Sequence, residues 1–106
     1  MKTPRECGSL TDVRTEIDRL DQDLLRLLAE RASYVKAAAR FKSSPAEVAA
    51  PERFQAMLAA RRQWAGQHGL SPDFVEGLYR EIVRYFIGEE HRHRATRGDD
   101  SSPRTL

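Results

Sequence analysis

The chain has 106 residues, and its 18 Lys and Arg residues nearly balance its 16 Asp and Glu residues, giving a net charge of +2. This length fits one small domain, and so small an excess of positive charge argues against nucleic acid as its partner. A single cysteine, Cys7, excludes an internal disulfide framework and suits a reducing compartment.

The N-terminal stretch "MKTPRECGSLTDV" has no apolar segment typical of a signal peptide. No uncharged apolar run approaches the roughly 20 residues that a membrane span needs. We therefore expect a cytoplasmic protein with no membrane partner. Sparse glycine and proline, with plentiful alanine and leucine, favour an all-α fold.

The first predicted helix begins after Ser9, which serves as N-cap, with Asp12 at the third helical position. The pattern is that of a heptad sustained over more than 30 residues, about 45–50 Å of helix. The apolar a and d positions are Leu10, Val13, Ile17, Leu20, Leu24, Leu27, Tyr34, Ala38 and Phe41.

A loop follows in "KSSPAEVAAP", because Pro45 and Pro51 disfavour helix at the residues before them. Pro51 suits the first turn of a second helix, "PERFQAMLAARRQWAG", for which Gly66 is the expected stop. Ser71 and Pro72 read as the N-cap and first residue of a third helix. Its expected buried side comprises Phe74, Val75, Leu78, Tyr79, Ile82, Val83, Phe86 and Ile87.

Residues 1–98 are thus predicted to form a single helical domain of one long and two shorter helices, followed by a disordered tail, 99–106. The basic stretch "HRHRATR" lacks interleaved aromatic residues, so a solvated end is preferred to a nucleic-acid site. The first helix is too long for its apolar seam to be covered by two short helices. The sequence therefore predicts an intertwined homodimer, in preference to a monomeric helical hairpin.

Two cations lie where the first helix should be apolar. Arg31 occupies an a position of the heptad, and Lys42 follows on the flank of the same seam about 16 Å further along the axis. Val35 and Ala38 lie between them, which predicts a shallow apolar trough with a cation at each end. Because buried cations require anions, a small dicarboxylate is the predicted ligand. Arg31 is alternatively a register-fixing polar residue of the seam.

Arg14 has the same heptad position as Lys42 but lies about 25 Å from Arg31 along a straight helix. An antiparallel partner helix brings the other subunit's copy of this arginine to the trough. For any single arginine the alternative is a solvated surface residue. On the third helix, Ile87 is predicted to line the site and Glu90 ends the apolar stripe, either facing the site or emerging into water.

The sequence contains no recognisable metal-binding motif and no recognisable catalytic motif of another class. His91 and His93 diverge on a helix, and neither a glycine-rich phosphate loop nor a Ser–His–Asp set is present. Catalysis, if present, is expected to proceed by positioning and electrostatics.

Over residues 10–95, the segments "DVRTEIDRLDQDLLRLLAERASYVKAAARFK", "APER" and "FVEGLYREIVRYFIGEE" resemble the all-helical chorismate mutase superfamily. They are most similar to its isochorismate pyruvate lyase branch, the salicylate-forming enzymes of siderophore pathways. The resemblance implies an intertwined all-α homodimer of chorismate mutase type II with two shared sites. It implies that Arg14 comes from the partner, that Arg31 and Lys42 are in-subunit cations, and that Glu90 stands where lyases typically have glutamine.

The implied reaction converts isochorismate to salicylate and pyruvate by a pericyclic hydrogen transfer, without metal or organic cofactor. Ala49-Ala50-Pro51-Glu52 resembles the lyases, whereas mutases usually have an acidic residue and an arginine there. Glu90 resembles some mutases, so a chorismate mutase is the alternative, and weak mutase activity is expected in a lyase. A non-catalytic helical dimerisation module is the third interpretation.

Overall fold

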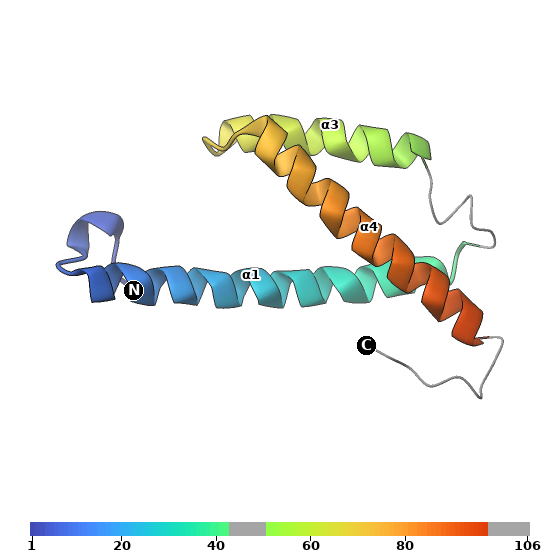
Figure 1. Ribbon diagram of the computed structural model, residues 1–106, viewed down its shortest axis with the longest axis horizontal. Coiled ribbons are helices and arrows are strands. Elements are labelled where there is room, and N and C mark those ends of the chain that lie inside the picture. Colours follow the sequence, from blue (N-terminus) through green and yellow to red (C-terminus); the bar gives the residue numbers. More distant parts are fainter. Residues whose placement is uncertain (43–50, 98–106) are drawn as a thin grey trace. The chain divides into compact units, whose positions relative to one another are not determined.

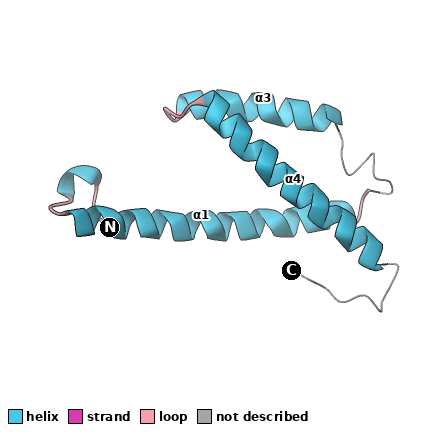
Figure 2. Cartoon of the chain, viewed as in Figure 1, coloured by secondary structure: helices cyan, strands magenta, loops and turns pink. Residues whose placement is uncertain are grey.

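A computed structural model describes the backbone of residues 1–42 and 51–97 and the side chains of residues 1–42 and 51–88. All regular structure in these ranges is helical (Figure 2). A short 3-10 helix, η1 (Pro4–Glu6), precedes the helices α1 (Leu10–Ala39), α3 (Pro51–Gln67) and α4 (Pro72–Arg97) (Figure 1). The all-α, three-helix prediction is therefore confirmed for the described residues.

The chain divides into two compact units, Met1–Tyr34 and Val35–Leu106. In the first unit, the start of α1 is fixed by local hydrogen bonds. The Asp12 backbone N–H donates to Ser9 Oγ over 3.0 Å, as predicted for an N-cap. Asp12 in turn accepts from the Gly8 N–H and from Lys2 Nζ, each at 2.9 Å. These hydrogen bonds, that from Gly8 first, lower the pKa of the Asp12 carboxyl and tie the N-terminal segment to α1.

The apolar stripe of α1 is exposed in the single chain. At 30 residues α1 is about 45 Å long, as the heptad pattern predicts. The six stripe residues of the first unit, which we call the α1 stripe, are 40–61% exposed: Leu10, Val13, Ile17, Leu20, Leu24 and Leu27. A continuous apolar stripe of this length on a helix is typical of a surface that another helix covers.

In the second unit, α3 and α4 form an antiparallel hairpin (residues 51–97). Its turn is a Schellman motif: Gly69 adopts φ 74°, and the Leu70 N–H donates to the Ala65 carbonyl over 2.8 Å. The Phe74 N–H donates to Ser71 Oγ over 3.2 Å and caps α4 as predicted. Buried hydrophobic residues in the described part of the chain are Ala39, Met57, Leu58, Ala65 and Val75.

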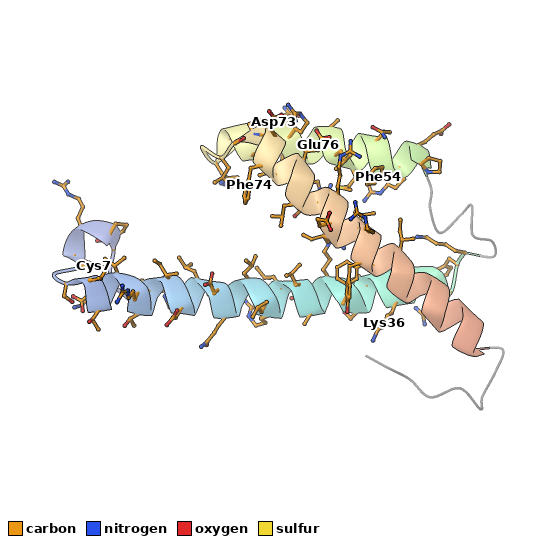
Figure 3. The ribbon with its side chains drawn as sticks, viewed as in Figure 1. Cys7, Lys36, Phe54, Asp73, Phe74 and Glu76 are labelled. Atoms are coloured by element: carbon orange, nitrogen blue, oxygen red, sulfur yellow. The ribbon has the colours of Figure 1, made fainter. Side chains whose placement is uncertain are left out.

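An ion-pair network, which we call the hairpin clamp, joins the two helices near the turn. Arg62 Nη1 on α3 lies 2.9 Å from both Asp73 Oδ1 and Glu76 Oε1 on α4. Arg80 Nη2 reaches Glu76 Oε2 over 2.7 Å, and its guanidinium lies 5.5 Å from the centroid of the Phe54 ring. Figure 3 shows Asp73 and Glu76 on the side of α4 toward α3. Hydrogen bonds from Arg80 first, and then Arg62, lower the pKa of the Glu76 carboxyl.

One detail of the sequence predictions is wrong. Helix α3 continues through Gly66 to Gln67, because it is Gly69, not Gly66, that supplies the left-handed residue of the cap. Phe74 and Leu78, expected on the buried side of the third helix, are 63% and 44% exposed in the single chain, so their burial in the predicted homodimer stays a prediction. Val75, in the first turn of α4, is buried. The segment 43–50 and the tail 99–106 lie outside the described residues.

No helix within residues 1–42 and 51–97 combines the length and low charge that a bilayer crossing requires.

Candidate active site

The predicted trough lies on α1. Arg31, Val35 and Ala38 follow one another at spacings of four and three residues in one continuous helix, so they occupy one helical face. All three are half-buried. Helix α1 ends just beyond them, and the Lys42 N–H donates to the Ala39 carbonyl over 3.3 Å in the closing turn. Lys42 is therefore set at the C-terminal end of α1, and it too is half-buried.

The arrangement suits an anion. A lysine ammonium at a helix C-terminus is favoured by the helix dipole, and a half-buried guanidinium offers a fork of donors to a carboxylate. Val35 and Ala38 add an apolar wall of small and medium side chains. Binding of a dicarboxylate by these residues stays a prediction.

Arg14 does not belong to the same cluster within one chain. It is exposed on α1, in the same unit as Arg31 and 17 positions before it, which corresponds to about 25 Å along the helix. No side-chain rotamer spans this separation. If Arg14 and Arg31 act on one small ligand, they must come from two copies of the chain.

The remaining two predicted residues lie on α4. Ile87 is half-buried in the last turns whose side chains are described. Glu90 is three residues further along and within the bounds of α4, but its side chain lies outside the described residues. The same holds for His91 and His93. Among the residues that are described, no three His, Cys, Asp or Glu side chains gather as metal ligands would.

A cavity in the α3–α4 hairpin was not predicted from the sequence. It measures about 320 Å³. We call it the hairpin cavity. The side chains that line it include Arg61, Trp64, His68, Leu70, Phe74, Leu78 and Tyr79. The guanidinium of Arg61 lies 4.6 Å from the Trp64 ring centroid and 5.5 Å from that of Tyr79. Arg61 three residues before Trp64 was the available sequence signal, since that spacing brings two helical side chains together.

Comparison with known proteins identifies the family. The family model described as "Chorismate mutase type II" matches residues 13–91, most of the chain. The chain is 50% identical over 99 residues to a protein of Pseudomonas aeruginosa named isochorismate pyruvate lyase. That match covers 92% of this chain and 98% of the relative.

Two further relatives are longer proteins. A T-protein of Haemophilus influenzae is 38% identical over 85 residues, covering 79% of this chain but 22% of the relative. A bifunctional chorismate mutase/prephenate dehydratase of Aquifex aeolicus is 38% identical over 89 residues, covering 78% of this chain and 24% of the relative. The resemblance seen in the sequence is thus confirmed: the chain belongs to the chorismate mutase type II family.

Proposed function

We propose that this protein is an isochorismate pyruvate lyase, which converts isochorismate to salicylate and pyruvate. The observation that carries this proposal is the 50% identity to the Pseudomonas aeruginosa relative of that name, which extends over nearly the whole of both chains. The relatives named for other activities match over only about a fifth to a quarter of their own length. The stretch Ala49-Ala50-Pro51-Glu52 also favours the lyase branch.

The proposed reaction is one concerted rearrangement of electrons. The ether bond between the ring and the enolpyruvyl oxygen breaks. The hydrogen on the hydroxyl-bearing ring carbon moves to the enolpyruvyl methylene, which becomes the methyl group of pyruvate. The ring gains a double bond and becomes aromatic salicylate. Every atom of the substrate is in one of the two products, so the reaction needs no co-reactant, and we propose that it proceeds without a cofactor.

Cations would hold the substrate and stabilise its transition state. Arg31 is proposed to bind a carboxylate through its guanidinium fork, while Lys42 stabilises the negative charge that builds on the ether oxygen as its bond to the ring lengthens. Half-burial strengthens both interactions relative to bulk water. Val35, Ala38 and Ile87 would pack against the ring and exclude water.

We propose a homodimer whose two active sites are shared. Its support is the separation of about 25 Å between Arg14 and Arg31 on a single helix, together with the exposed α1 stripe. In such a dimer, the Arg14 guanidinium of one copy completes the site formed by Arg31 and Lys42 of the other. A symmetric pair of helices gives two equivalent sites.

Glu90 is the proposed fourth polar contact. A carboxyl group donates a hydrogen bond to a substrate oxygen only when it is protonated. An ionised Glu90 would instead repel a dianion. The proposed role therefore requires the protonated form in the complex.

Chorismate mutase is the second candidate function. It is favoured by Glu90, which resembles some mutases, and by the relative of Aquifex aeolicus whose name includes chorismate mutase. The two substrates are dicarboxylates of similar shape, so we propose weak mutase activity alongside the lyase reaction. We further propose that the protein acts in the cytoplasm and supplies salicylate for a siderophore.

The test is to incubate purified protein separately with isochorismate and with chorismate and to quantify salicylate, pyruvate and prephenate. A lyase forms salicylate and pyruvate in equal amounts, and much faster than it forms prephenate. Faster prephenate formation would assign the protein to the mutases. If neither substrate is converted, a non-catalytic dimerisation module replaces both enzymatic proposals.

A further inference from the structure

The segment before α1 turns back along the helix and is tied to it. We call residues 1–9 the N-terminal hook. Within the hook, the Thr3 N–H donates to Glu6 Oε1 over 2.8 Å, and the Glu6 N–H donates to the Thr3 carbonyl over 2.9 Å. These two hydrogen bonds close η1, and the chain on its N-terminal side lies beside the first turns of α1 (Figure 1).

Asp12 is the residue of α1 to which the hook is attached. Its Oδ2 atom accepts from Lys2 Nζ and from the Gly8 N–H, each over 2.9 Å, so one carboxylate oxygen holds two points of the hook. The backbone N–H of Asp12 donates to Ser9 Oγ over 3.0 Å. The Asp12 side chain is 28% exposed, so water competes only partly for these hydrogen bonds.

A second carboxylate extends the attachment by one helical turn. Hydrogen bonds from the Arg19 side chain first, and then from the Lys2 backbone N–H, lower the pKa of the Glu16 carboxyl. Arg19 also lies 3.7 Å from Asp23. Asp12, Glu16, Arg19 and Asp23 follow one another at spacings of four, three and four residues. The hook and these ion pairs therefore occupy one face of α1.

Arg14 stands on the opposite side of the same turns. It follows Asp12 by two residues, which is about 200° around an α-helix, so the hook leaves its face uncovered. Arg14 is exposed, and no side chain in residues 1–42 or 51–88 forms an ion pair or a hydrogen bond with its guanidinium. The backbone of α1 alone therefore sets the place from which this side chain extends.

The backbone at Arg14 depends in turn on the first turn of α1. The first N–H groups of a helix have no partner within it, and helix ends open locally at little cost. Arg14 is the fifth residue of α1, so the opening of a single turn displaces its Cα atom. The hydrogen bonds from the Asp12 N–H to Ser9 Oγ and from the Val13 N–H to the Ser9 carbonyl belong to this turn. Fastening the hook to Asp12 opposes its opening.

We propose that Asp12 is a positioning residue for the reaction: by holding the hook against α1, it keeps the first turn helical and fixes where Arg14 stands in the partner subunit's site. Asp12 acts through the backbone and touches no substrate, because it lies on the far side of the helix from Arg14. This inference rests on the proposed function, in which Arg14 of one copy completes the site of the other. It adds a residue outside the site to those that determine the rate.

A mixed dimer can assign the effect of Asp12 to one of its two chains. The donor chain carries Arg31→Ala and supplies Arg14, and the acceptor chain carries Arg14→Ala and supplies Arg31. Each homodimer should be nearly inactive, so turnover of isochorismate reports the single complete site of the mixed dimer. Asp12→Ala is then placed either in the donor or in the acceptor. The kcat and KM values of the two arrangements are compared after complete subunit exchange.

We expect Asp12→Ala in the donor to lower kcat/KM by about fivefold or more, mostly by raising KM, because Arg14 spends less time in its binding position. The same substitution in the acceptor should change neither constant, since that chain supplies no Arg14. Both arrangements contain one Asp12→Ala chain per dimer, so a general loss of stability is matched between them. Equal losses from the two chains, or no loss from either, would overturn the proposal.

Asp23→Ala in the donor is the matched control. It removes the same charge from the same face of α1, but the ion pair of Asp23 is with Arg19 of the same helix and does not hold the hook. Its kcat/KM should stay close to that of the unmodified mixed dimer. A loss as large as that from Asp12→Ala would overturn the specific role of Asp12.

A milder substitution keeps the test decisive if the Asp12→Ala donor does not accumulate. Lys2→Met removes the ion pair to the hook and leaves the sequence of α1 unchanged. It should raise KM from the donor only, and an equal rise from either chain would overturn the proposal. An inactive mixed dimer, despite proven exchange and an active wild type, would overturn the shared site and this inference with it. An active mixed dimer that is indifferent to the place of Asp12→Ala would overturn this inference alone.

Discussion

Arg62 on α3 and Glu76 on α4 are joined by a hydrogen-bonded ion pair, with Nη1 2.9 Å from Oε1. The same carboxylate is held from the other side by Arg80, one turn further along α4. Arg62 also binds Asp73 in the first turn of α4. These ion pairs lie near the turn of the hairpin that carries Ile87 and Glu90, and they add to the packing of its buried residues Met57, Leu58, Ala65 and Val75.

This clamp predicts an acid-sensitive hairpin. Arg80 and Arg62 lower the pKa of the folded Glu76 carboxyl below its unfolded value. The stabilisation is therefore fully present at pH values above the unfolded pKa and is lost as the pH falls through the folded pKa. Glu76→Gln should lower the melting temperature at neutral pH, and the difference from wild type should shrink toward acid pH.

Glu81→Gln is the matched control for Glu76→Gln. Among the described side chains, Glu81 pairs with Arg84 on its own helix, and both are largely exposed. Its substitution should change the melting temperature less at neutral pH. Equal effects of the two substitutions across the pH range would show that the clamp does not hold the hairpin.

Lys42 is predicted to act in catalysis rather than in stability. Lys42→Ala should lower the rate of salicylate formation by about 10²–10³-fold, because the ammonium stabilises charge that appears only in the transition state. Circular dichroism should show an unchanged helix content. A solvated lysine at a helix end would contribute about 0.3–1 kcal/mol to stability and nothing to the rate.

Lys36 provides the comparison on the same helix. It is exposed in the last turn of α1 (Figure 3), and Lys36→Ala removes the same charge from the same region. Lys36→Ala should turn over isochorismate at close to the wild-type rate. Similar rates for the two variants would exclude a catalytic role for Lys42.

Arg14 and Arg31 should complement each other between subunits. Arg14→Ala and Arg31→Ala homodimers each lack one arginine in both sites, so both should be nearly inactive. In a mixed dimer, one site has both arginines and the other has neither. After complete subunit exchange, half of the dimers are mixed, so we expect recovery of about a quarter of the wild-type rate. Proven exchange without recovery would mean that each chain forms its own site.

Glu90 should make activity depend on pH. The unperturbed carboxyl has a pKa of about 4.3; in the proposed site, the charge of a dianionic substrate would raise this pKa and the nearby cations, Lys42 especially, would lower it. Activity should fall as the pH rises through this pKa, because the protonated donor is lost. Glu90→Gln should flatten the profile and preserve or raise the rate at neutral pH, since an amide donates at any ordinary pH. An unchanged profile would place Glu90 outside the site.

Local sequence signals predicted the helices well. Ser9 and Ser71 were recognised as caps because a short hydroxyl side chain satisfies a free backbone N–H, and both hydrogen bonds are present. Pro51 and Pro72 likewise begin α3 and α4. The cap at Gly69 was missed in favour of Gly66, because a glycine shows that a left-handed residue is possible but not which glycine adopts it.

The site was less accessible to sequence reasoning. Helical periodicity puts Arg31, Val35 and Ala38 on one face of α1, and their role as a binding site stays a prediction. The hairpin cavity depends on how α3 meets α4, and no periodic pattern encodes that contact. The approach of the Arg61 guanidinium on α3 to the Tyr79 ring on α4 therefore could not be predicted from the sequence.

The measurement that tests the account most directly follows a label through the proposed reaction. Isochorismate deuterated at the hydroxyl-bearing ring carbon is incubated with the purified protein, and both products are analysed by mass spectrometry. The account predicts equal amounts of salicylate and pyruvate, with the deuterium in the methyl group of pyruvate. Absence of salicylate, or pyruvate whose methyl hydrogen comes from solvent, would contradict it.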